Sequence, residues 1–257
     1  MERDHIPVGG EVNDMRQTSQ LYKDILAGLN TMHTVVEIET VSNGATEYVE
    51  IGEDKIYSVK TSGSLFPENK PSIGNFVSRE LDLIIEPPEN VTIPRRARIR
   101  LFVYAKNDSE QSERIPKGVF FIDTRDFNIN KTKMMIHGYD AALLFEEDFS
   151  SNNIVWPITG VNLAIRIANS VGVSVGAGVI EAAQSFPNTM VPLQIGKTKR
   201  EIMCEIAAAY CGNWIIDDQG WLRLVNLNTN PQDRVYQYLA DENGNAILLG
   251  GERILVG

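Results

Sequence analysis

Apolar and polar residues alternate along much of the chain between residues 31 and 140. Turn-forming Gly, Asn, Asp and Pro residues separate the alternating segments, and no segment of helical period interrupts them. The predicted strands are Thr34–Val41, Glu47–Ile51, Lys55–Lys60, Arg79–Ile85, Ala97–Tyr104, Gly118–Thr124 and Thr132–His137. Many short strands at close spacing are typical of an antiparallel barrel or sandwich.

Helical spacing replaces the alternation after Tyr139. Asp140 can cap a short helix that runs through Phe145. A longer helix is predicted from Thr159 through Val171, with Gly172 closing it and a short strand after it. The change of period marks a second kind of structure in this half of the chain.

A third helix is predicted to begin at a capping box formed by Thr198 and Glu201, whose side chains bond the free N–H groups of the first turn. It runs through Tyr210, and Gly212 is the expected left-handed residue after it. Residues 213–225 then predict a hairpin with its turn at 217–220. Together these elements predict a small α+β domain.

The predicted organisation has four parts, and the fold class is α+β and β-rich. Residues 1–30 form an N-terminal arm with a weak helix around Leu21, Ile25 and Leu29, and residues 31–150 form a mainly β barrel or sandwich domain. Residues 151–225 form the α+β domain with two helix–Gly–strand units. Residues 226–257 form a C-terminal β-hairpin, and its return to a barrel is left open.

Composition narrows the classes of function. Of 257 residues, 43% are apolar and 23% are charged, which fits a chain that buries a core and excludes disorder as the main theme. The net charge of -10 argues against a basic face for duplex DNA. No run approaches the roughly 18 apolar residues that span a bilayer, and Met1–His5 leads into no secretory signal.

The cysteine pattern indicates no disulfide. Cys204 and Cys211 both fall in the third predicted helix, roughly 10 Å apart along its axis, whereas a disulfide needs Cα atoms within about 7 Å. We expect both cysteines to be buried in the interior as small apolar side chains. We also expect the protein to be made in a reducing cytoplasm.

Gly196-Lys197-Thr198 resembles the end of a phosphate-binding loop. The full loop needs a glycine at the position of Val191, and Pro192 beside it lacks a backbone N–H. The capping role of Thr198 therefore explains these residues better.

Residues 241–252 place Asp241, Asn243, Asn245 and Glu252 at ligand positions of a calcium loop. Ala246 stands where the loop normally carries glycine, and the flanks predict strands in place of helices. A simple hairpin turn is the better interpretation.

The three histidines, His5, His33 and His137, lie far apart in sequence and form no helix-borne zinc pair. His137 follows an alternating strand, so we expect a hydrogen-bonded structural residue.

Two pairs of carboxylates, Asp123 with Asp126 and Glu146 with Glu147, could in principle serve acid–base chemistry. Acidic residues in loops are usually only solvated. The sequence therefore predicts no catalytic, cofactor-binding or metal-binding residue, no cofactor and no enzymatic activity.

One basic cluster stands out in this acidic chain. Arg95, Arg96, Arg98 and Arg100 lie at the start of a predicted strand. They could bind an anion, but pairing with carboxylates of a neighbour is the favoured interpretation.

Several segments together resemble the hub proteins of tailed-phage tails, the group related to myophage baseplate hubs and their prophage counterparts. These segments are Ser62–Ile84, Gly118–Thr124 followed by Met135–Asp140, and Thr198–Val225. The first resembles the family's loop and strand after its first hairpins, and the second its strand pair before the first helix. The third resembles its helix, Gly and hairpin. Their order and spacing carry the likeness.

The resemblance implies a trimeric ring at the tail tip of a virion assembled in the bacterial cytoplasm, with tube-type antiparallel β-barrel domains. Such a hub joins the tail tube to the distal tail and its spike or fibre, encloses the tape-measure protein, and lines the channel for DNA ejection. A lumen of negative charge would let DNA slide without sticking. The matched residues are scaffold residues.

Two other functions remain open. One is the hub of a phage-tail-like contractile injection particle or bacteriocin. The other is a tail-associated cell-wall hydrolase, which would need a carboxylate or thiol cluster whose loss abolishes activity.

Overall fold

The computed structural model describes residues 18–28, 31–42, 44–67, 70–176, 179, 189–227, 248–249 and 252–253. The fold is β-rich α+β and divides into two compact units. Unit 1 comprises Met1–Gly63, Ser78–Leu143 and Ile216–Trp221, and unit 2 comprises Ser64–Val77, Leu144–Ile215 and Leu222–Gly257. Among the described residues, no helix combines the length and the apolar character needed to cross a membrane.

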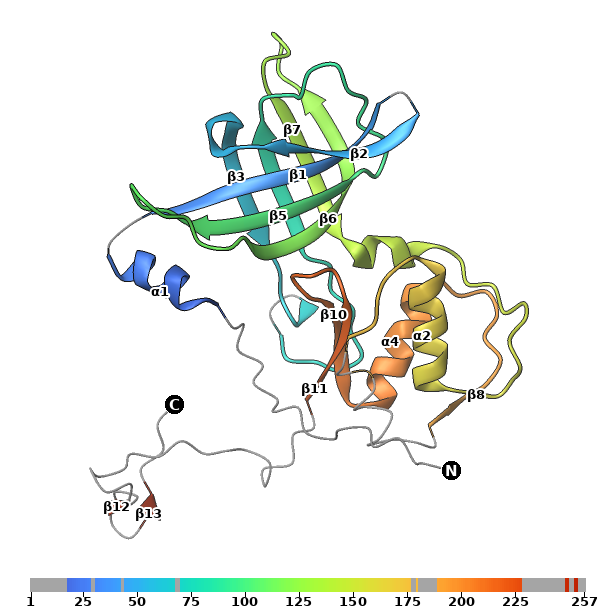
Figure 1. Ribbon diagram of the computed structural model, residues 1–257. Coiled ribbons are helices and arrows are strands. Elements are labelled where there is room, and N and C mark those ends of the chain that lie inside the picture. The colour runs from blue at the N-terminus through green and yellow to red at the C-terminus, as the bar shows by residue number, and fades with distance from the viewer. Residues whose placement is uncertain are drawn as a thin grey trace, which may run out of the picture. The chain divides into compact units, whose positions relative to one another are not determined.

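Unit 1 is built on one antiparallel sheet of seven strands in the order β2-β1-β5-β6-β7-β4-β3 (Figure 1). All seven predicted strands are confirmed. Their bounds are β1 Met32–Ser42, β2 Ala45–Ile51, β3 Ile56–Ser62, β4 Glu80–Ile85, β5 Arg98–Ala105, β6 Ile115–Phe127 and β7 Met134–Asp140.

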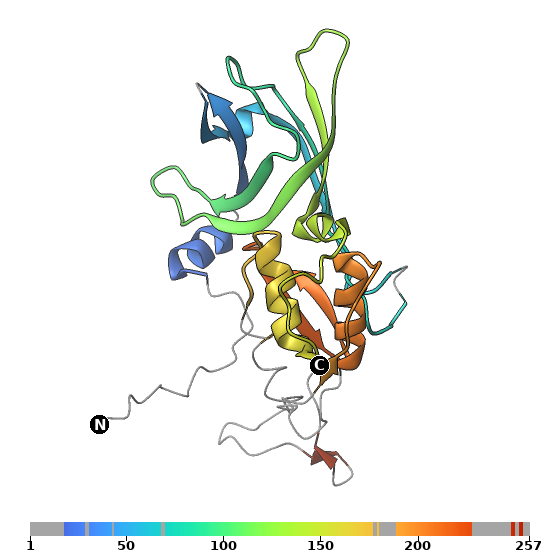
Figure 2. The same ribbon diagram turned by 90° about the vertical axis from the view of Figure 1, so that its right-hand side faces the viewer.

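The sheet curls into a half-barrel, which both views show (Figures 1 and 2). Its two edge strands, β2 and β3, are consecutive in the chain and are joined by the short 3-10 helix η1, Glu53–Lys55. A connection this short keeps the two edges near each other, although among the described strands β2 pairs only with β1 and β3 only with β4. The seven strands therefore form an open, strongly curved sheet.

The concave side of the curl contains the core of unit 1. Because successive side chains of a strand point to opposite faces, the alternation of the sequence places one apolar set inside, and β5 is buried at every second residue. The core cluster consists of Val36, Ile38, Ile51, Leu81, Leu83, Ile85, Ile93, Ala97, Ile99, Leu101, Phe120, Ile122, Met134 and Ile136.

The helix predicted near the N-terminus is present as α1, Gln20–Ala27, and it is tied to unit 1. The Ser19 side chain accepts a hydrogen bond from the Tyr22 N–H at 3.1 Å and caps the helix. Ser19 also donates its backbone N–H to Glu113 at 2.7 Å, and Ile25 is buried. Residues 1–17 of the predicted N-terminal segment lie outside the described residues.

The short helix predicted after Asp140 is a 3-10 helix, η3, Ala141–Glu146. The Ala142 N–H donates to Asp140 Oδ1 at 3.0 Å, so Asp140 begins this helix as the sequence predicts.

Unit 2 contains the two predicted helices, α2 Gly160–Ser170 and α4 Lys199–Ala209. It also contains the strands of the predicted hairpin, β10 Gly212–Ile216 and β11 Leu222–Asn226, except for Ile216, which is grouped with the hairpin turn in unit 1. A second strand pair, β8 Ile158–Thr159 with β9 Met190–Val191, lies beside α2. The buried side chains of these elements include Leu163, Ala164, Ile167, Ile202, Met203, Ile206, Ala207, Tyr210 and Trp214.

Residues 64–77 also belong to unit 2, although they lie between two strands of the unit 1 sheet in sequence. The Trp214 N–H donates to the Asn75 carbonyl at 2.8 Å, and the Gly74 N–H donates to the Gly212 carbonyl at 2.9 Å. These bonds attach the segment to β10.

The predicted end of α4 is wrong in detail. The helix ends at Ala209, and the left-handed residue after its cap is Cys211 (φ 53°), so Cys211 is not helical. Gly212 opens β10, where a Cβ atom would lie 2.6 Å from the Val225 carbonyl oxygen. Close approach of two strands explains this glycine better than helix termination.

The first helix–Gly–strand unit is only partly confirmed. Gly172 (φ 73°) follows α2 in the left-handed conformation, as predicted. Of the strand expected at residues 173–175, the structure has a single bridge, between Val175 and Leu222.

Candidate interaction surfaces

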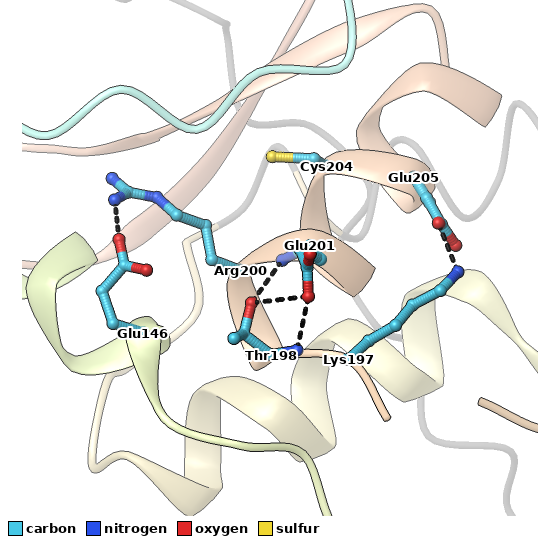
Figure 3. A pocket seen from close by; sticks show the side chains of 7 residues that line it. All are labelled: Glu146, Lys197, Thr198, Arg200, Glu201, Cys204 and Glu205. Atoms are coloured by element: carbon cyan, nitrogen blue, oxygen red, sulfur yellow. Dashed lines mark hydrogen bonds and ion pairs between the residues drawn. The ribbon is translucent and has the colours of Figure 1, made fainter. Parts of the chain in front are cut away.

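The first turn of α4 is fixed by the predicted capping box (Figure 3). Thr198 Oγ1 accepts from the Glu201 N–H at 3.2 Å, and Glu201 Oε2 accepts from the Thr198 N–H at 2.7 Å. This reciprocal pair accounts for Thr198, as the sequence indicated, without a phosphate ligand.

Two cationic residues follow in the same turn, where the positive end of the helix dipole disfavours them. Lys199 Nζ lies 2.6 Å from Glu147 Oε2, and Arg200 forms an ion pair with Glu146. The carboxylate pair Glu146 and Glu147 therefore neutralises the start of α4, which is not the solvated role that the sequence predicted for it. The Lys199 side chain is only 11% exposed, so its ion pair is the more shielded of the two.

A hollow of about 450 Å³ lies against this helix start and is lined by Glu146, Lys197, Thr198, Arg200, Glu201, Cys204 and Glu205. Lys197 pairs with Glu205 across one side of it (Figure 3). Burial raises the pKa of the half-buried Cys204 thiol, which keeps the sulfur protonated at neutral pH. The expectation of interior thiols is confirmed in part, because Cys204 and Cys211 are both free but only half-buried.

The capping box makes stability depend on pH. Hydrogen bonds from Thr198 lower the pKa of Glu201 below its ordinary range. A carboxyl with a lowered folded-state pKa stabilises the fold above its unfolded pKa, and the contribution is lost as pH falls through the folded pKa.

We therefore expect Glu201→Ala to lower the urea midpoint at about pH 7 and to lower it much less at about pH 3. Urea titrations of wild type and variant at both pH values measure this difference, with Glu89→Ala, an exposed glutamate of a turn, as the matched control. A Glu201→Ala deficit that does not change with pH would contradict the capping account.

The outer face of the sheet holds a network of charged residues across β1, β2 and β5. Arg114 binds Glu50 with two hydrogen bonds of 2.8 and 2.9 Å, and Arg100 Nη1 lies 3.5 Å from Glu37 Oε2. The Arg100 guanidinium also lies 4.0 Å from the centre of the Tyr48 ring. The hydrogen bonds from Arg114 lower the pKa of Glu50.

For Arg100, the network favours pairing with a carboxylate over anion binding, because Arg100 forms an ion pair with Glu37 of the neighbouring strand. Arg98 lies over the Phe121 ring at 5.5 Å, and its backbone N–H donates to Glu39 at 3.2 Å. Arg95 and Arg96 are exposed in the preceding turn. The four residues do not form one anion-binding stripe.

A second hollow, of about 220 Å³, lies on the outer face of β4, β6 and β7, and we call it the sheet hollow. It is lined by Asp82, Leu83, Ile84, Thr124, Asp126, Met135, Ile136 and His137. His137 Nδ1 lies 2.8 Å from Asp82 Oδ1, and the ring packs edge-on against Tyr139 at 4.9 Å. The predicted hydrogen bond of His137 is therefore present, with Asp82 as its partner.

Of the remaining candidates from the sequence, Asp126 shares the sheet hollow with His137, whereas His33 and Asp123 are not among its lining residues. His33 pairs with Glu53 and stacks on Tyr104, while Asp123 and Asp126 are exposed on β6, as predicted. Within the described part of the chain, no group of three His, Cys, Asp or Glu side chains is placed to hold a metal ion.

Several candidates lie outside the described residues: His5 and the calcium-loop residues Asp241, Asn243 and Asn245. Part of that loop is described, since β12 Leu248–Leu249 pairs with β13 Glu252–Arg253 in antiparallel register. This pairing agrees with the hairpin interpretation of the segment.

The exposed end of the β6–β7 hairpin was not predicted from the sequence. Phe127, the last residue of β6, is 49% exposed, and Ile129 is fully exposed in the turn after it, where polar residues are the rule. A signal was present, because residues 126–131 interleave these two apolar residues with Asp, Asn and Lys. Their exposure makes the end of this hairpin a candidate interaction surface.

The fold resembles two solved tail proteins. The 43 kDa tail protein of prophage MuSo2 from Shewanella oneidensis is 14% identical with a TM-score of 0.44, and the similarity covers 76% of this chain and 56% of that one. The tail protein from Neisseria meningitidis MC58 is 13% identical with a TM-score of 0.45, covering 78% of this chain and 52% of that one. This chain thus spans just over half the length of either protein. No protein-family model matches the chain, and no curated protein matches its sequence.

Proposed function

We propose that the chain is a structural protein of a phage or prophage tail, located in the tail-tip (baseplate) hub of the virion. In this role it connects the tail tube to the distal tail and its spike or fibre, and contributes to the channel through which DNA is ejected. Its partners are two further copies of itself, the tube and distal tail proteins, and the tape-measure protein. It acts as a scaffold without catalysis.

The observation that carries the proposal is the place of the hub-like segments in the fold. Ser62–Ile84 contains all of β4 except Ile85, Gly118–Thr124 and Met135–Asp140 lie in β6 and β7, and Thr198–Val225 contains α4 and all of the β10–β11 hairpin except Asn226. The segments that resemble the hub family therefore contribute to three strands of the seven-stranded sheet and supply α4 with most of the hairpin. The names of the two similar structures, both tail proteins, are in line with this role.

The open form of the sheet supports a tube-type domain. Among the described strands, β2 and β3 are the edges of this curved sheet and each pairs on one side only, so their outer backbone groups can pair with a neighbour. Three such sheets around one axis would form a ring whose edges are covered by neighbours.

Deletion of the gene from its phage or prophage tests the proposal. We expect tail assembly to stop at an intermediate in the deletion strain, so that heads accumulate and infectious particles do not form. A plasmid copy of the full chain is expected to restore infectious particles. A plasmid with an early stop codon is the control. Infectious particles of normal length without the chain would contradict a hub role.

The hydrolase alternative needs a separate measurement. The purified chain is incubated with isolated peptidoglycan, and the release of soluble muropeptides is measured against a known muramidase. A scaffold releases none above the buffer blank, whereas turnover by the purified chain would replace the structural proposal with an enzymatic one.

A further inference from the structure

The hairpin of β6 and β7 extends beyond the rest of the curled sheet (Figures 1 and 2). The last five residues of β6, 123–127, are all exposed, although the earlier part of this strand is largely buried. We call residues 123–135 the arm. Its length is set by the strand ladder between β6 and β7, which continues to the pair Phe127 and Met134.

The end of the arm is apolar and cationic at the same time. Ile129 is 100% exposed and Phe127 is 49% exposed. Lys131 and Lys133 follow them, and the Lys133 ammonium lies 4.1 Å from the centre of the Tyr57 ring. Such an end fits a partner that offers apolar surface together with negative charge.

The sheet hollow offers both. Strand pairing aligns Ile84, Met135 and Asp126 in one row across β4, β7 and β6. Asp82 lies in the next row, opposite His137, so the two carboxylates stand on the strands at either side of β7. Met135 is 42% exposed, and the Asp82 side chain is 64% exposed while it contacts His137. The hollow is thus apolar with a carboxylate on either side.

A chain cannot place its own arm in its own sheet hollow. Asp126 and Met135 line the hollow and are themselves part of the arm, in the ladder directly below the exposed end. A two-stranded ladder does not fold back on itself over so few residues. The occupant must therefore come from another molecule.

We propose that the arm of one copy of this chain binds in the sheet hollow of the next copy. Ile129 then contacts Ile84 and Met135, and Lys131 faces Asp82 and Asp126. Each copy carries both surfaces, so the contact is head-to-tail and closes into a ring when the rotation allows it. This inference rests on the proposed ring assembly and names the surfaces that hold it together.

Analytical ultracentrifugation of the full-length chain over a concentration series tests the contact. Wild type is expected to associate, and Ile129→Asp to raise the dissociation constant by about tenfold or more, since it removes a buried apolar side chain and adds a charge beside two carboxylates. The matched control is Val155→Asp, which changes an 88% exposed valine of unit 2 and leaves association unchanged. Circular dichroism melting curves verify that each variant is folded.

A charge exchange makes the test independent of folding effects. Lys131→Glu and Asp126→Lys each weaken association, and the double variant restores it to within about threefold of wild type, because each arm again meets an opposite charge. A purely structural role of either residue predicts that the two losses add.

Three results would overturn the inference: a monomeric wild-type chain, an Ile129→Asp variant that associates like wild type, or a double variant with no recovery. Flotation with phosphatidylglycerol vesicles supplies one more outcome. A monomer whose vesicle binding depends on Ile129 would assign the arm to a lipid surface and reject the contact between copies. The failure of this contact and of the hub role are distinguishable, because gene deletion tests the role without reference to the arm.

Discussion

Replacement of Asn213 by aspartate is expected to lower the free energy of unfolding by about 3 kcal/mol or more, because it buries a charge against two carbonyl oxygens. Asn213 is fully buried, and its Nδ2 donates to the Leu65 carbonyl at 3.1 Å and the Ser72 carbonyl at 2.8 Å. Its Oδ1 accepts from the Asn75 N–H at 2.9 Å. This side chain thus joins Leu65, Ser72 and Asn75 to β10, in addition to the backbone bonds of this segment with Gly212 and Trp214.

The Asn213→Asp deficit should shrink in acid. Burial beside carbonyl oxygens raises the folded-state pKa of the new carboxyl above its unfolded value. Stability relative to wild type is then lost as pH rises and regained as pH falls, because the protonated carboxyl can donate to one carbonyl.

Urea titration at about pH 7 and about pH 4, followed by tryptophan fluorescence, measures both effects, since Trp214 is the next residue and is 1% exposed. The matched control, Asn152→Asp, makes the same exchange at an exposed position and should change stability by less than about 0.5 kcal/mol. A variant as stable as wild type at neutral pH would contradict the proposed role of this amide.

Asp140→Ala is expected to lower the free energy of unfolding by about 2 to 5 kcal/mol, since one buried and one partly buried backbone donor lose their acceptor. Asp140 is fully buried, and its carboxylate accepts from the Arg79 N–H and the Ala142 N–H, each at 3.0 Å. It therefore joins the end of β7 to the residue before β4 and begins η3.

Chemical denaturation measures the effect of Asp140→Ala, and amide hydrogen exchange locates it. The largest increase in the amide exchange rate relative to wild type is expected at Arg79 and Ala142. The control is Asp123→Ala on the exposed part of β6, with an expected change below about 0.5 kcal/mol. Equal losses in the two variants would show that burial of the Asp140 carboxylate is not what stabilises this corner.

The strands of unit 1 were predictable because local alternation and tertiary burial agree. In β5, Ile99, Leu101 and Val103 alternate with Arg98 and Arg100, and the structure buries the first set and leaves the second partly exposed. The capping box at Thr198 was predictable for a similar reason, since its bonds lie within four consecutive residues.

Long-range contacts limited the prediction elsewhere. Gly212 has the same sequence signature as a helix-ending glycine, but the approach of the Val225 carbonyl determines its place, and Cys211 takes the left-handed conformation instead. The assignment of residues 64–77 to unit 2 depends on bonds between Asn75 and Asn213, which are 138 positions apart. No local pattern encodes such a pair.

In the candidate surfaces, too, local features were predictable from the sequence and long-range contacts were not. The sequence revealed the charged residues but not their partners: Glu146 and Glu147 bind Arg200 and Lys199, which are more than fifty positions away. The sheet hollow combines side chains of three strands whose register only the fold defines. The apolar end of the arm, by contrast, was present in the sequence around Ile129.

The position of the chain in a particle tests the hub proposal most directly. Purified particles carrying an epitope tag on the full-length chain are labelled with an antibody fragment and reconstructed by cryo-electron microscopy. For a hub protein we expect label at the tail tip only, in three copies around the tail axis. Label along the whole tube, on the head, or in tip density without threefold symmetry would contradict it.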